Sequence, residues 1–172
     1  MENWYVMQVL SGHEEKVVSK CNLIIDKNVL YECFIPYVAR MKKYKGKWHQ
    51  LEEALFKGYV FLICDDIVEL YHQLKQVPEL TKMLGRNENE IIPLKTSEIN
   101  FLKRFGKDDH FIDMSIGYIE GDVIRIIEGP LLGKEGMIKK IDRHKRIAYV
   151  EVDFLNQTTI AKIGLEIISK NS

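Results

Sequence analysis

The chain has 172 residues, of which 46% are hydrophobic, 10% aromatic and 29% charged. This composition is typical of a folded globular protein and excludes a disordered chain, and the length suits one ordinary domain or two small ones. Lys and Arg together number 25 and Asp and Glu also number 25, so the net charge is zero and gives no general case for nucleic-acid binding. Any such case must come from local clusters of charge.

The cysteines and the N-terminus indicate the compartment. Cys21, Cys33 and Cys64 form no CxxC pair and are odd in number, which is typical of small buried residues in a reducing compartment. The first residues lack the charged and apolar pattern of a signal peptide, and no apolar run approaches the roughly 18 residues of a membrane span. We therefore expect a cytoplasmic protein that does not enter a membrane.

The first elements in the chain are predicted to be a strand and a helix. Residues 4–10 read as a strand, after which Ser11 or Gly12 is expected to cap a helix that runs to about residue 27. Two glutamates in the first turn suit the helix dipole. Helical spacing predicts the buried face of this helix: Val17, Cys21, Ile24 and Ile25.

A basic hairpin follows. Residues 31–38 are predicted to form an edge strand, because Pro36 cannot donate to a ladder, and Lys45-Gly46-Lys47 reads as a hairpin tip. The hairpin carries cations and aromatic rings without an acid between residues 39 and 49: Arg40, Lys42, Lys43, Lys45 and Lys47, with Tyr44 and Trp48 among them. Such a hairpin can bind phosphates and stack on bases. Alternatively, it can be a solvated arm whose lysines keep an edge strand from pairing with another chain.

The most apolar segment is residues 59–64, where β-branched and aromatic side chains run without alternation. This pattern predicts a central strand that is covered on both faces. Gly58, at its start, permits a positive φ or a close approach. Phe56 lies before the bend, so its ring can project from the sheet edge as a contact. Apolar residues are mostly buried, however, so this stretch alone favours Phe56 and Tyr59 as ordinary core aromatics.

Helices and a short segment complete the first half. Asp65-Asp66 is expected to cap a helix that ends before Val77-Pro78, with residues 78–85 irregular or extended and a third helix over residues 96–105. Spacing predicts the inward residues of the two helices: Val68, Tyr71, His72 and Leu74, then Ile99, Leu102 and Phe105. The order of elements predicts an α+β sandwich, with helices against an antiparallel sheet.

The last third of the chain changes pattern. A polar linker is expected over residues 106–116, and after it come only short strands, over residues 121–127, 137–142, 146–154 and 158–162 with 165–168. Ala148, Val150, Val152 and Phe154 alternate and are expected to face a core. Five short strands in about 50 residues predict a small β-barrel.

The sequence argues against an enzyme. The five histidines, at positions 13, 49, 72, 110 and 144, have no metal-like spacing with one another or with the cysteines. Glu52-Glu53 and Asp65-Asp66 are adjacent pairs, which fit a strand edge and a helix cap better than an acid–base dyad. No GxxxxGK[ST] phosphate loop is present, and we expect no cofactor.

The motifs together resemble the NusG family of transcription elongation factors. The matching segments of the first half are Trp4-Tyr5-Val6, Ser11-Gly12-His13-Glu14, Phe56-x-Gly58-Tyr59-Val60 and Val77-Pro78, and the segment from Gly121-Asp122 through Gly129-Pro130 to Gly136 is similar to a KOW motif. The resemblance implies a NusG amino-terminal α+β domain over residues 1–105, a linker over 106–116 and a five-stranded, SH3-like KOW barrel over 117–172.

The resemblance also implies partners. Trp4, Phe56 and Tyr59 are expected to border the hydrophobic surface that binds the clamp helices of RNA polymerase, since aromatic anchors suit a helix-in-groove contact. Binding there would bridge the clamp and favour the polymerase state that does not pause. The protein is expected to be a monomer.

Two departures from the family pattern point to a specialised member. Lys57 stands where the family usually has proline. Leu155-Asn156-Gln157 stands where general NusG proteins carry Phe-Gly-Arg in the loop that contacts the ribosome or Rho, so that coupling is not implied. The chain is similar to the LoaP group, processive antiterminators of long biosynthetic operons that recognise an RNA hairpin in the leader.

A basic turn in the barrel is the expected RNA contact. Its cations are Lys139, Lys140, Arg143, His144, Lys145 and Arg146, with only Asp142 opposed. The alternative is a solvated turn. The hairpin residues Lys42, Lys43 and Lys45 are the competing site, with DNA near the polymerase as their expected partner. Two further readings are a general NusG that couples to ribosome or Rho, and a ribosome-associated KOW protein with no polymerase contact.

Overall fold

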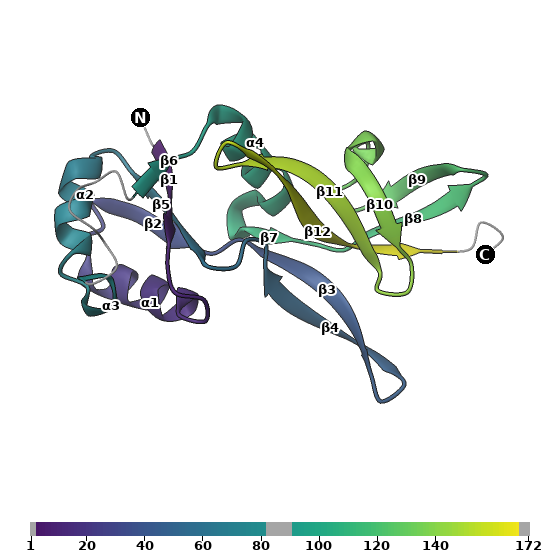
Figure 1. Cartoon of the computed structure of the whole chain (residues 1–172), viewed down its shortest axis with the longest axis horizontal. Coiled ribbons are helices and arrows are strands. Elements are labelled where there is room, and N and C mark those ends of the chain that lie inside the picture. The colour runs from purple at the N-terminus through teal and green to yellow at the C-terminus, as the bar shows by residue number, and fades with distance from the viewer. Residues whose placement is uncertain (1–2, 82–90, 169–172) are drawn as a thin grey trace. The chain divides into compact units, whose positions relative to one another are not determined.

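The computed structural model describes residues 3–81 and 91–168 (Figure 1). The chain divides into two compact units, one made of residues 1–35 and 56–99 and the other of residues 36–55 and 100–172. The chain therefore leaves the first unit at residue 36, returns to it at residue 56, and passes into the second unit for good within helix α4 (Thr96–Gly106).

The first unit is built on a four-stranded antiparallel sheet with the order β2-β5-β1-β6. Its strands are β1 (Asn3–Gln8), β2 (Leu30–Phe34), β5 (Tyr59–Cys64) and β6 (Ile91–Pro93). Strand β5 lies between β2 and β1, and five of its six residues are buried, so the predicted central, doubly covered strand is confirmed.

The alternation of β5 assigns its side chains to two faces. Leu62 pairs with Cys33 of β2, and the Cys33 thiol is hydrogen-bonded to Cys21 of α1, so this face meets the helix. Phe61, on the opposite face, pairs with Phe34 and Val6. Gly58 enters the strand with φ +84°, a left-handed conformation that favours glycine.

The helices of the first unit are α1 (Glu14–Ile24), α2 (Ile67–Leu74) and the short α3 (Pro78–Thr81). Asp66 caps α2 as predicted, because its carboxylate accepts hydrogen bonds from the backbone N–H groups of Val68 and Glu69. The N-cap of α1 is His13 rather than Ser11 or Gly12, and it makes no side-chain capping bond.

Several predictions of the buried helix faces need correction. In α1, Val17 and Cys21 are buried as predicted, as is Ile25 just after the helix, but Ile24 is 45% exposed. In α2, Val68 and His72 were predicted to be buried, but both are exposed, and Leu70 is buried instead. In α4, Leu102 and Phe105 are buried and Ile99 is half-buried. Short helices leave spacing ambiguous, since neighbouring residues differ by only 100° around the axis.

Two segments were assigned wrongly from sequence. The strand predicted over residues 31–38 is two strands, because the chain breaks at Ile35-Pro36 and passes from the sheet of β2 to that of β3. The segment predicted to be irregular or extended from residue 78 begins with α3, which Pro78 opens at the first helical position. The rest of that prediction, residues 82–85, lies outside the described residues.

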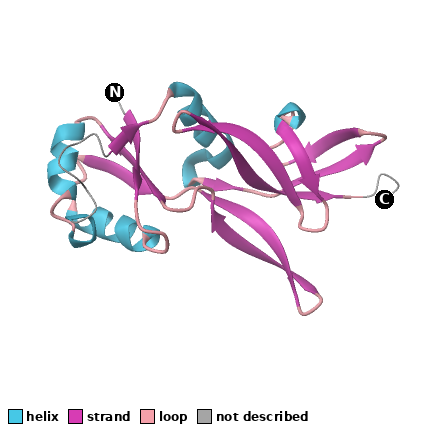
Figure 2. Cartoon of the chain, in the orientation of Figure 1, coloured by secondary structure: helices cyan, strands magenta, loops and turns pink. Residues whose placement is uncertain are grey.

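The second unit is mostly strand (Figure 2). A three-stranded sheet has the order β4-β3-β7, with β3 (Tyr37–Tyr44), β4 (Lys47–Ala54) and β7 (Phe111–Ile112). The tip of the β3–β4 hairpin is Lys45-Gly46, where both residues have positive φ, as a tight two-residue turn requires.

A five-stranded curled sheet completes the second unit, with the order β10-β11-β12-β8-β9. Its strands are β8 (Ser115–Glu120), β9 (Val123–Glu128), β10 (Ile138–Asp142), β11 (Ile147–Phe154) and β12 (Gln157–Ile167). The predicted inward residues of β11, at positions 148, 150, 152 and 154, are all buried. The predicted fold class, an α+β domain followed by a five-stranded barrel-like domain, is confirmed.

The strands of this sheet differ in detail from the prediction. Residues 158–162 and 165–168 were expected as two strands, but the single strand β12 spans residues 157–167. The fifth strand is β8, which begins inside the expected linker. The rest of residues 106–116 includes the 3-10 helix η2 (Lys107–Asp109) and β7, whose pairing with β3 joins this segment to the hairpin.

Within the second unit, β12 approaches β3 closely. A Cβ atom on Gly164 would lie 2.5 Å from the carbonyl oxygen of Ala39 and would also collide with the Met114 sulfur. Only glycine fits at this crossing, because any side chain would require the backbone of β3 to move. The crossing brings the hairpin onto the five-stranded sheet.

Candidate nucleic-acid interface

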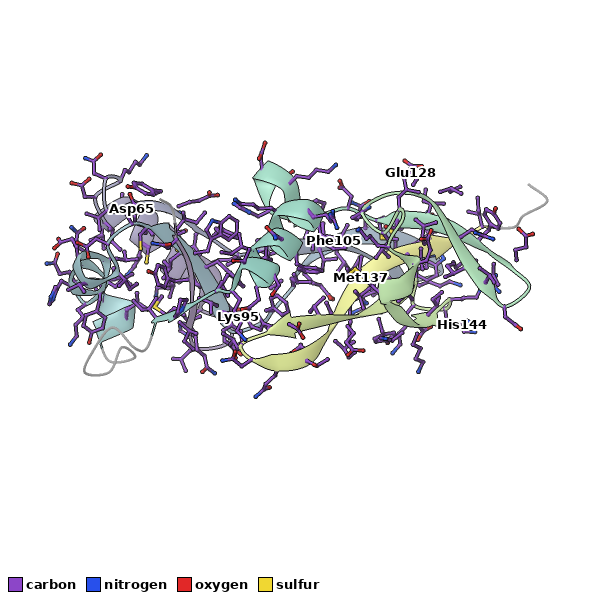
Figure 3. The ribbon with its side chains drawn as sticks, turned by 90° about the horizontal axis from the view of Figure 1, so that it is seen from above. Asp65, Lys95, Phe105, Glu128, Met137 and His144 are labelled. Atoms are coloured by element: carbon purple, nitrogen blue, oxygen red, sulfur yellow. The ribbon has the colours of Figure 1, made fainter. Side chains whose placement is uncertain are left out.

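The basic turn lies between β10 and β11, with His144 labelled in Figure 3. Arg143, His144 and Lys145 are exposed. The Asp142 carboxylate accepts a hydrogen bond from the Lys145 backbone N–H at 3.0 Å, and this bond, together with the Lys145 charge, lowers the pKa of Asp142. The ionised Asp142 thus shapes the turn that presents the three side chains.

Arg146, the last residue of the turn, is held in place by two partners. Its guanidinium carbon lies 4.0 Å from the centre of the Trp48 ring, and its Nη1 is 3.7 Å from a Glu166 carboxylate oxygen. Its backbone, at φ +55°, takes the left-handed conformation, and its carbonyl accepts a hydrogen bond from Leu165. Arg146 is therefore a stacking partner of the hairpin more than a mobile cation.

The hairpin supplies a second group of cations. Lys42, Lys43 and Lys45 are exposed, and the register of β3 and β4 places Lys43 opposite Trp48. The Lys45 ammonium lies 5.4 Å from the centre of the Tyr44 ring. The hairpin therefore alternates cations with flat rings, the composition of a surface that binds a phosphate backbone and bases.

Two cavities are each lined by residues of both the hairpin and the turn. The first has a volume of about 360 Å³ and is lined by hairpin residues that include Lys42, Lys43 and Trp48 and by His144 and Lys145 of the turn. The second, of about 450 Å³, is lined by Trp48, Glu166 and Ile167 and by the turn residues Arg143, His144 and Arg146. The two basic segments that sequence reasoning treated as competitors therefore form one surface, with Trp48 lining both cavities.

Lys139 and Lys140 lie apart from this arrangement on β10. The Lys139 ammonium is 3.5 Å from a Glu151 carboxylate oxygen, and that of Lys140 is 5.8 Å from the centre of the Tyr149 ring. Neither residue lines either cavity. The six cations predicted from sequence thus separate into a turn group at 143–146 and a strand pair that has local partners.

Arg40 belongs to the interface, although sequence reasoning did not single it out as a binding residue. Its side chain is 13% exposed, and its Nη1 donates to Glu53 at 3.0 Å. Its Nε is buried and has no hydrogen-bond acceptor within the described part of the chain, and the residue lines the first cavity. No periodicity marks such a residue, because the turn residues that line the same cavity lie some hundred positions away in the sequence.

In the first unit, Trp4 and Phe56, two of the three residues expected to contact polymerase, belong to a row of rings. Ring-centre distances are 5.5 Å from Trp4 to Phe34, 5.6 Å from Phe34 to Phe61 and 6.3 Å from Phe61 to Phe56. Trp4 is 6% and Phe56 9% exposed, while Tyr59 is half-buried. The prediction that the Phe56 ring projects onto the surface is therefore wrong, because the ring packs in this row.

No group of three or more His, Cys, Asp or Glu side chains among the described residues could hold a metal ion. Cys21, Cys33 and Cys64 are buried free thiols, as predicted. None of the helices within residues 3–81 and 91–168 has the length and apolar character needed to cross a membrane.

A helix-covered antiparallel sheet, followed by a curled five-stranded sheet with a basic turn, defines a two-part protein with a KOW-type second part. The family model described as "Transcription termination factor nusG" matches residues 2–103, and the KOW motif matches residues 120–152. The chain belongs to the NusG family, whose members are transcription factors and not enzymes. It is accordingly a transcription termination/antitermination factor.

Relatives match over almost the whole chain. The transcription termination/antitermination protein NusG of Helicobacter pylori strain J99 is 26% identical over 169 residues, covering 95% of both chains. That of Streptococcus pyogenes serotype M3 is 29% identical over 175 residues, covering 95% of this chain and 93% of its own. A solved structure of Thermotoga maritima NusG, titled for its domain interaction, has a TM-score of 0.50 at 24% identity, covers 95% of this chain and 94% of its own, and shows the likeness in fold.

Proposed function

We propose that this chain is a processive antitermination factor that binds RNA polymerase through its first unit and a leader RNA hairpin through its second. The proposal rests on the surface that the β3–β4 hairpin and the 143–146 turn form together. No cofactor is required, because the factor acts by favouring one conformational state of the polymerase.

The single observation that carries the RNA assignment is that cations without an ion pair line the two cavities that share Trp48. Lys42, Lys43 and Arg143 form no ion pair with any described residue, whereas Lys139, outside the surface, pairs with Glu151. The net charge of the whole chain is zero, so this local excess is not a general property of the protein. Cations beside an aromatic ring suit a ligand with phosphates and bases.

The polymerase contact is proposed for the accessible surface at the start of β5, around Tyr59. Tyr59 is half-buried, and Leu10, 60% exposed, follows Val9, whose N–H donates to the Gly58 carbonyl at 2.8 Å. This places an exposed leucine beside the start of β5. Trp4 and Phe56 would support the contact from beneath, and Tyr59 would touch the clamp helices, since partly exposed aromatic anchors are typical of such contacts.

The specialised role, like that of the LoaP group, is favoured over general coupling to ribosome or Rho. In the turn between β11 and β12, Leu155 has φ +53° and Asn156 φ +62°, so the chain reverses in two residues. Leu155-Asn156-Gln157 lacks the Phe-Gly-Arg triplet of general NusG proteins in this turn.

The experiment is transcription by purified RNA polymerase through a terminator, with and without the leader sequence upstream. Read-through that requires both the protein and the leader supports the proposal. Polymerase binding with read-through that ignores the leader would favour a general NusG, and failure to bind core polymerase in a pull-down would overturn the polymerase contact proposed for the first unit. The matched variant Lys139→Glu changes a cation outside the surface and should behave like the unmodified chain.

A further inference from the structure

We propose that the cavity between the hairpin and the turn receives one unpaired RNA base, which stacks on Trp48 while the adjoining phosphates are held by lysines. This inference rests on the proposed function, RNA binding by the second unit. It goes further by naming the feature of the RNA that is read and the residues that read it.

The size and the lining of the cavity suit a base. Its volume of about 360 Å³ lies in the range of pockets that hold small ligands. Met41, Leu51 and Trp48 supply apolar lining. A nucleobase has two flat faces that gain from stacking on an aromatic ring, and polar atoms only along its edge.

The polar groups of the cavity suit the edge of a base. Arg40 Nε is a buried donor with no acceptor in the described structure, and the Arg40 Nη1 group holds the Glu53 carboxylate at 3.0 Å. The Nε atom has almost no accessible surface and does not face the open cavity, whereas the Glu53 side chain is 36% exposed. Several base edges offer N–H donors that the Glu53 carboxylate can accept.

The entrance of the cavity suits a phosphate backbone. Lys42 and Lys43 from the hairpin and Lys145 from the turn are exposed and line the cavity. Lys42 and Lys43 are neighbours on β3 and Lys145 lies on the turn, so cations from two segments can contact phosphates on both sides of an inserted base. Glu53 is the one acid in the lining, and Arg40 already neutralises it.

Arg146 holds the Trp48 ring in position for stacking. Its guanidinium lies over Trp48, but Arg146 lines only the second cavity. The ring is thus fixed by a cation and still meets the first cavity. A fixed ring loses little freedom when a base stacks on it, which lowers the cost of binding.

An unpaired base is required because a paired one is out of reach. In an RNA duplex the bases are stacked and the major groove is deep and narrow, whereas bases in loops and bulges can be splayed onto aromatic side chains. The lysines alone would bind any duplex. The cavity adds a preference for RNA with a base available for insertion.

The test compares two RNA probes on the full chain. One is a short, fully paired, fluorescently labelled RNA duplex, and the other is the same duplex with a single bulged nucleotide. We expect the bulged probe to bind on the order of tenfold more tightly, the effect of stacking one base on an aromatic ring. In a Trp4→Phe background Trp48 is the only tryptophan, and its emission should be quenched by the bulged probe alone.

Three variants assign the preference to the cavity. Trp48→Ala should bind both probes equally and retain affinity for the paired duplex, because the lysines remain. Trp48→Phe keeps a ring and should keep part of the preference, which separates stacking from any loosening of the hairpin. Glu53→Gln keeps the size of the side chain but weakens the acceptor for the base edge, so it should reduce the preference.

The outcomes separate this inference from the proposed function. Equal affinity of the unmodified chain for both probes, or a preference that survives in Trp48→Ala, overturns the base pocket while leaving RNA binding intact. If neither probe binds, RNA is not a ligand of the second unit, and the proposed function fails together with this inference.

Discussion

The guanidinium of Arg146 lies 4.0 Å from the centre of the Trp48 ring, so a residue that ends the basic turn is stacked on a residue of the basic hairpin. The contact joins two segments that each carry cations and makes one surface of them. Arg146 also meets Glu166 at 3.7 Å, which anchors the stack to β12.

Arg146→Ala should release Trp48. A cation–π contact of this kind contributes about 0.5–1 kcal/mol at an exposed site and about 2 when it is desolvated. In the Trp4→Phe background, we expect the substitution to make Trp48 fluorescence more accessible to acrylamide quenching. Arg146→Lys, which keeps the charge but loses the planar group, should fall between the two proteins. Unchanged quenching would show that the stack does not hold the ring.

Phe56→Ala should destabilise the first unit. The ring is 9% exposed and belongs to the row that includes Phe61, so its removal leaves a cavity. Phe→Ala substitutions in a core typically cost about 3–5 kcal/mol, which is measurable by urea denaturation. Tyr59→Ala, at a half-buried position, should cost less stability and weaken polymerase binding more. Full stability of the Phe56 variant would restore the surface role expected from the sequence.

The salt dependence of RNA binding should show whether the turn residues contact RNA phosphates. Each phosphate contact contributes on the order of one unit to the slope of log affinity against log salt concentration. Reversing Arg143 and Lys145 to glutamate should lower both the affinity and the slope, since both side chains are exposed and line the cavities. Lys139→Glu is the matched control, because Lys139 pairs with Glu151 and lines neither cavity. An equal loss of RNA affinity in the control would mean that RNA is bound by charges spread over the whole barrel and not by the turn in particular.

Local sequence signals were sufficient for much of the fold. The apolar run 59–64, the Lys45-Gly46 turn and the Asp66 cap were each predictable, because each depends on a few neighbouring residues. Strand β8 was missed because its sequence, SIGYIE, follows a polar segment and shows only weak alternation. The edge position predicted from Pro36 holds for β2, but the break of the chain at this proline was missed, because proline permits both.

The candidate site was only half predictable. Composition identified the cations of the turn and of the hairpin, but it could not bring them together, because the contact of Arg146 with Trp48 depends on how β12 crosses β3. The burial of the Arg40 Nε was not predictable either, since a charged residue becomes buried only through tertiary packing. Phe56 was placed on the surface by the resemblance, whereas its burial follows the general preference of large apolar rings for the interior.

Stability at alkaline pH should depend on Cys64. Burial first, and then the nearby Asp65 and Asp66 carboxylates, raise the pKa of this thiol from its usual 9.0 to about 11. A thiol whose pKa is raised by folding contributes stability that is fully present below pH 9.0 and is lost as the pH rises toward about 11. Urea midpoints measured across this window should fall. In Cys64→Ala the fall should be shallower, although not absent, because the pKa of Cys33 is also raised, by its hydrogen bond to Cys21 and by burial. An identical fall in both proteins would contradict the assignment.

Gly164→Ala should push the hairpin away from the five-stranded sheet. The added methyl group would lie 2.5 Å from the Ala39 carbonyl oxygen, and because that atom belongs to the backbone, β3 itself must shift. Overpacking of this kind costs about 1–3 kcal/mol. Since β3 carries Lys42 and Lys43, the shift should also separate these lysines from the turn and weaken RNA binding more than polymerase binding, which is assigned to the other unit. Gly136→Ala is the control, because a methyl group there meets no atom within 4 Å, and it should leave both the urea midpoint and the RNA affinity unchanged. If Gly164→Ala lowers stability but leaves RNA affinity intact, the hairpin and the turn bind RNA independently.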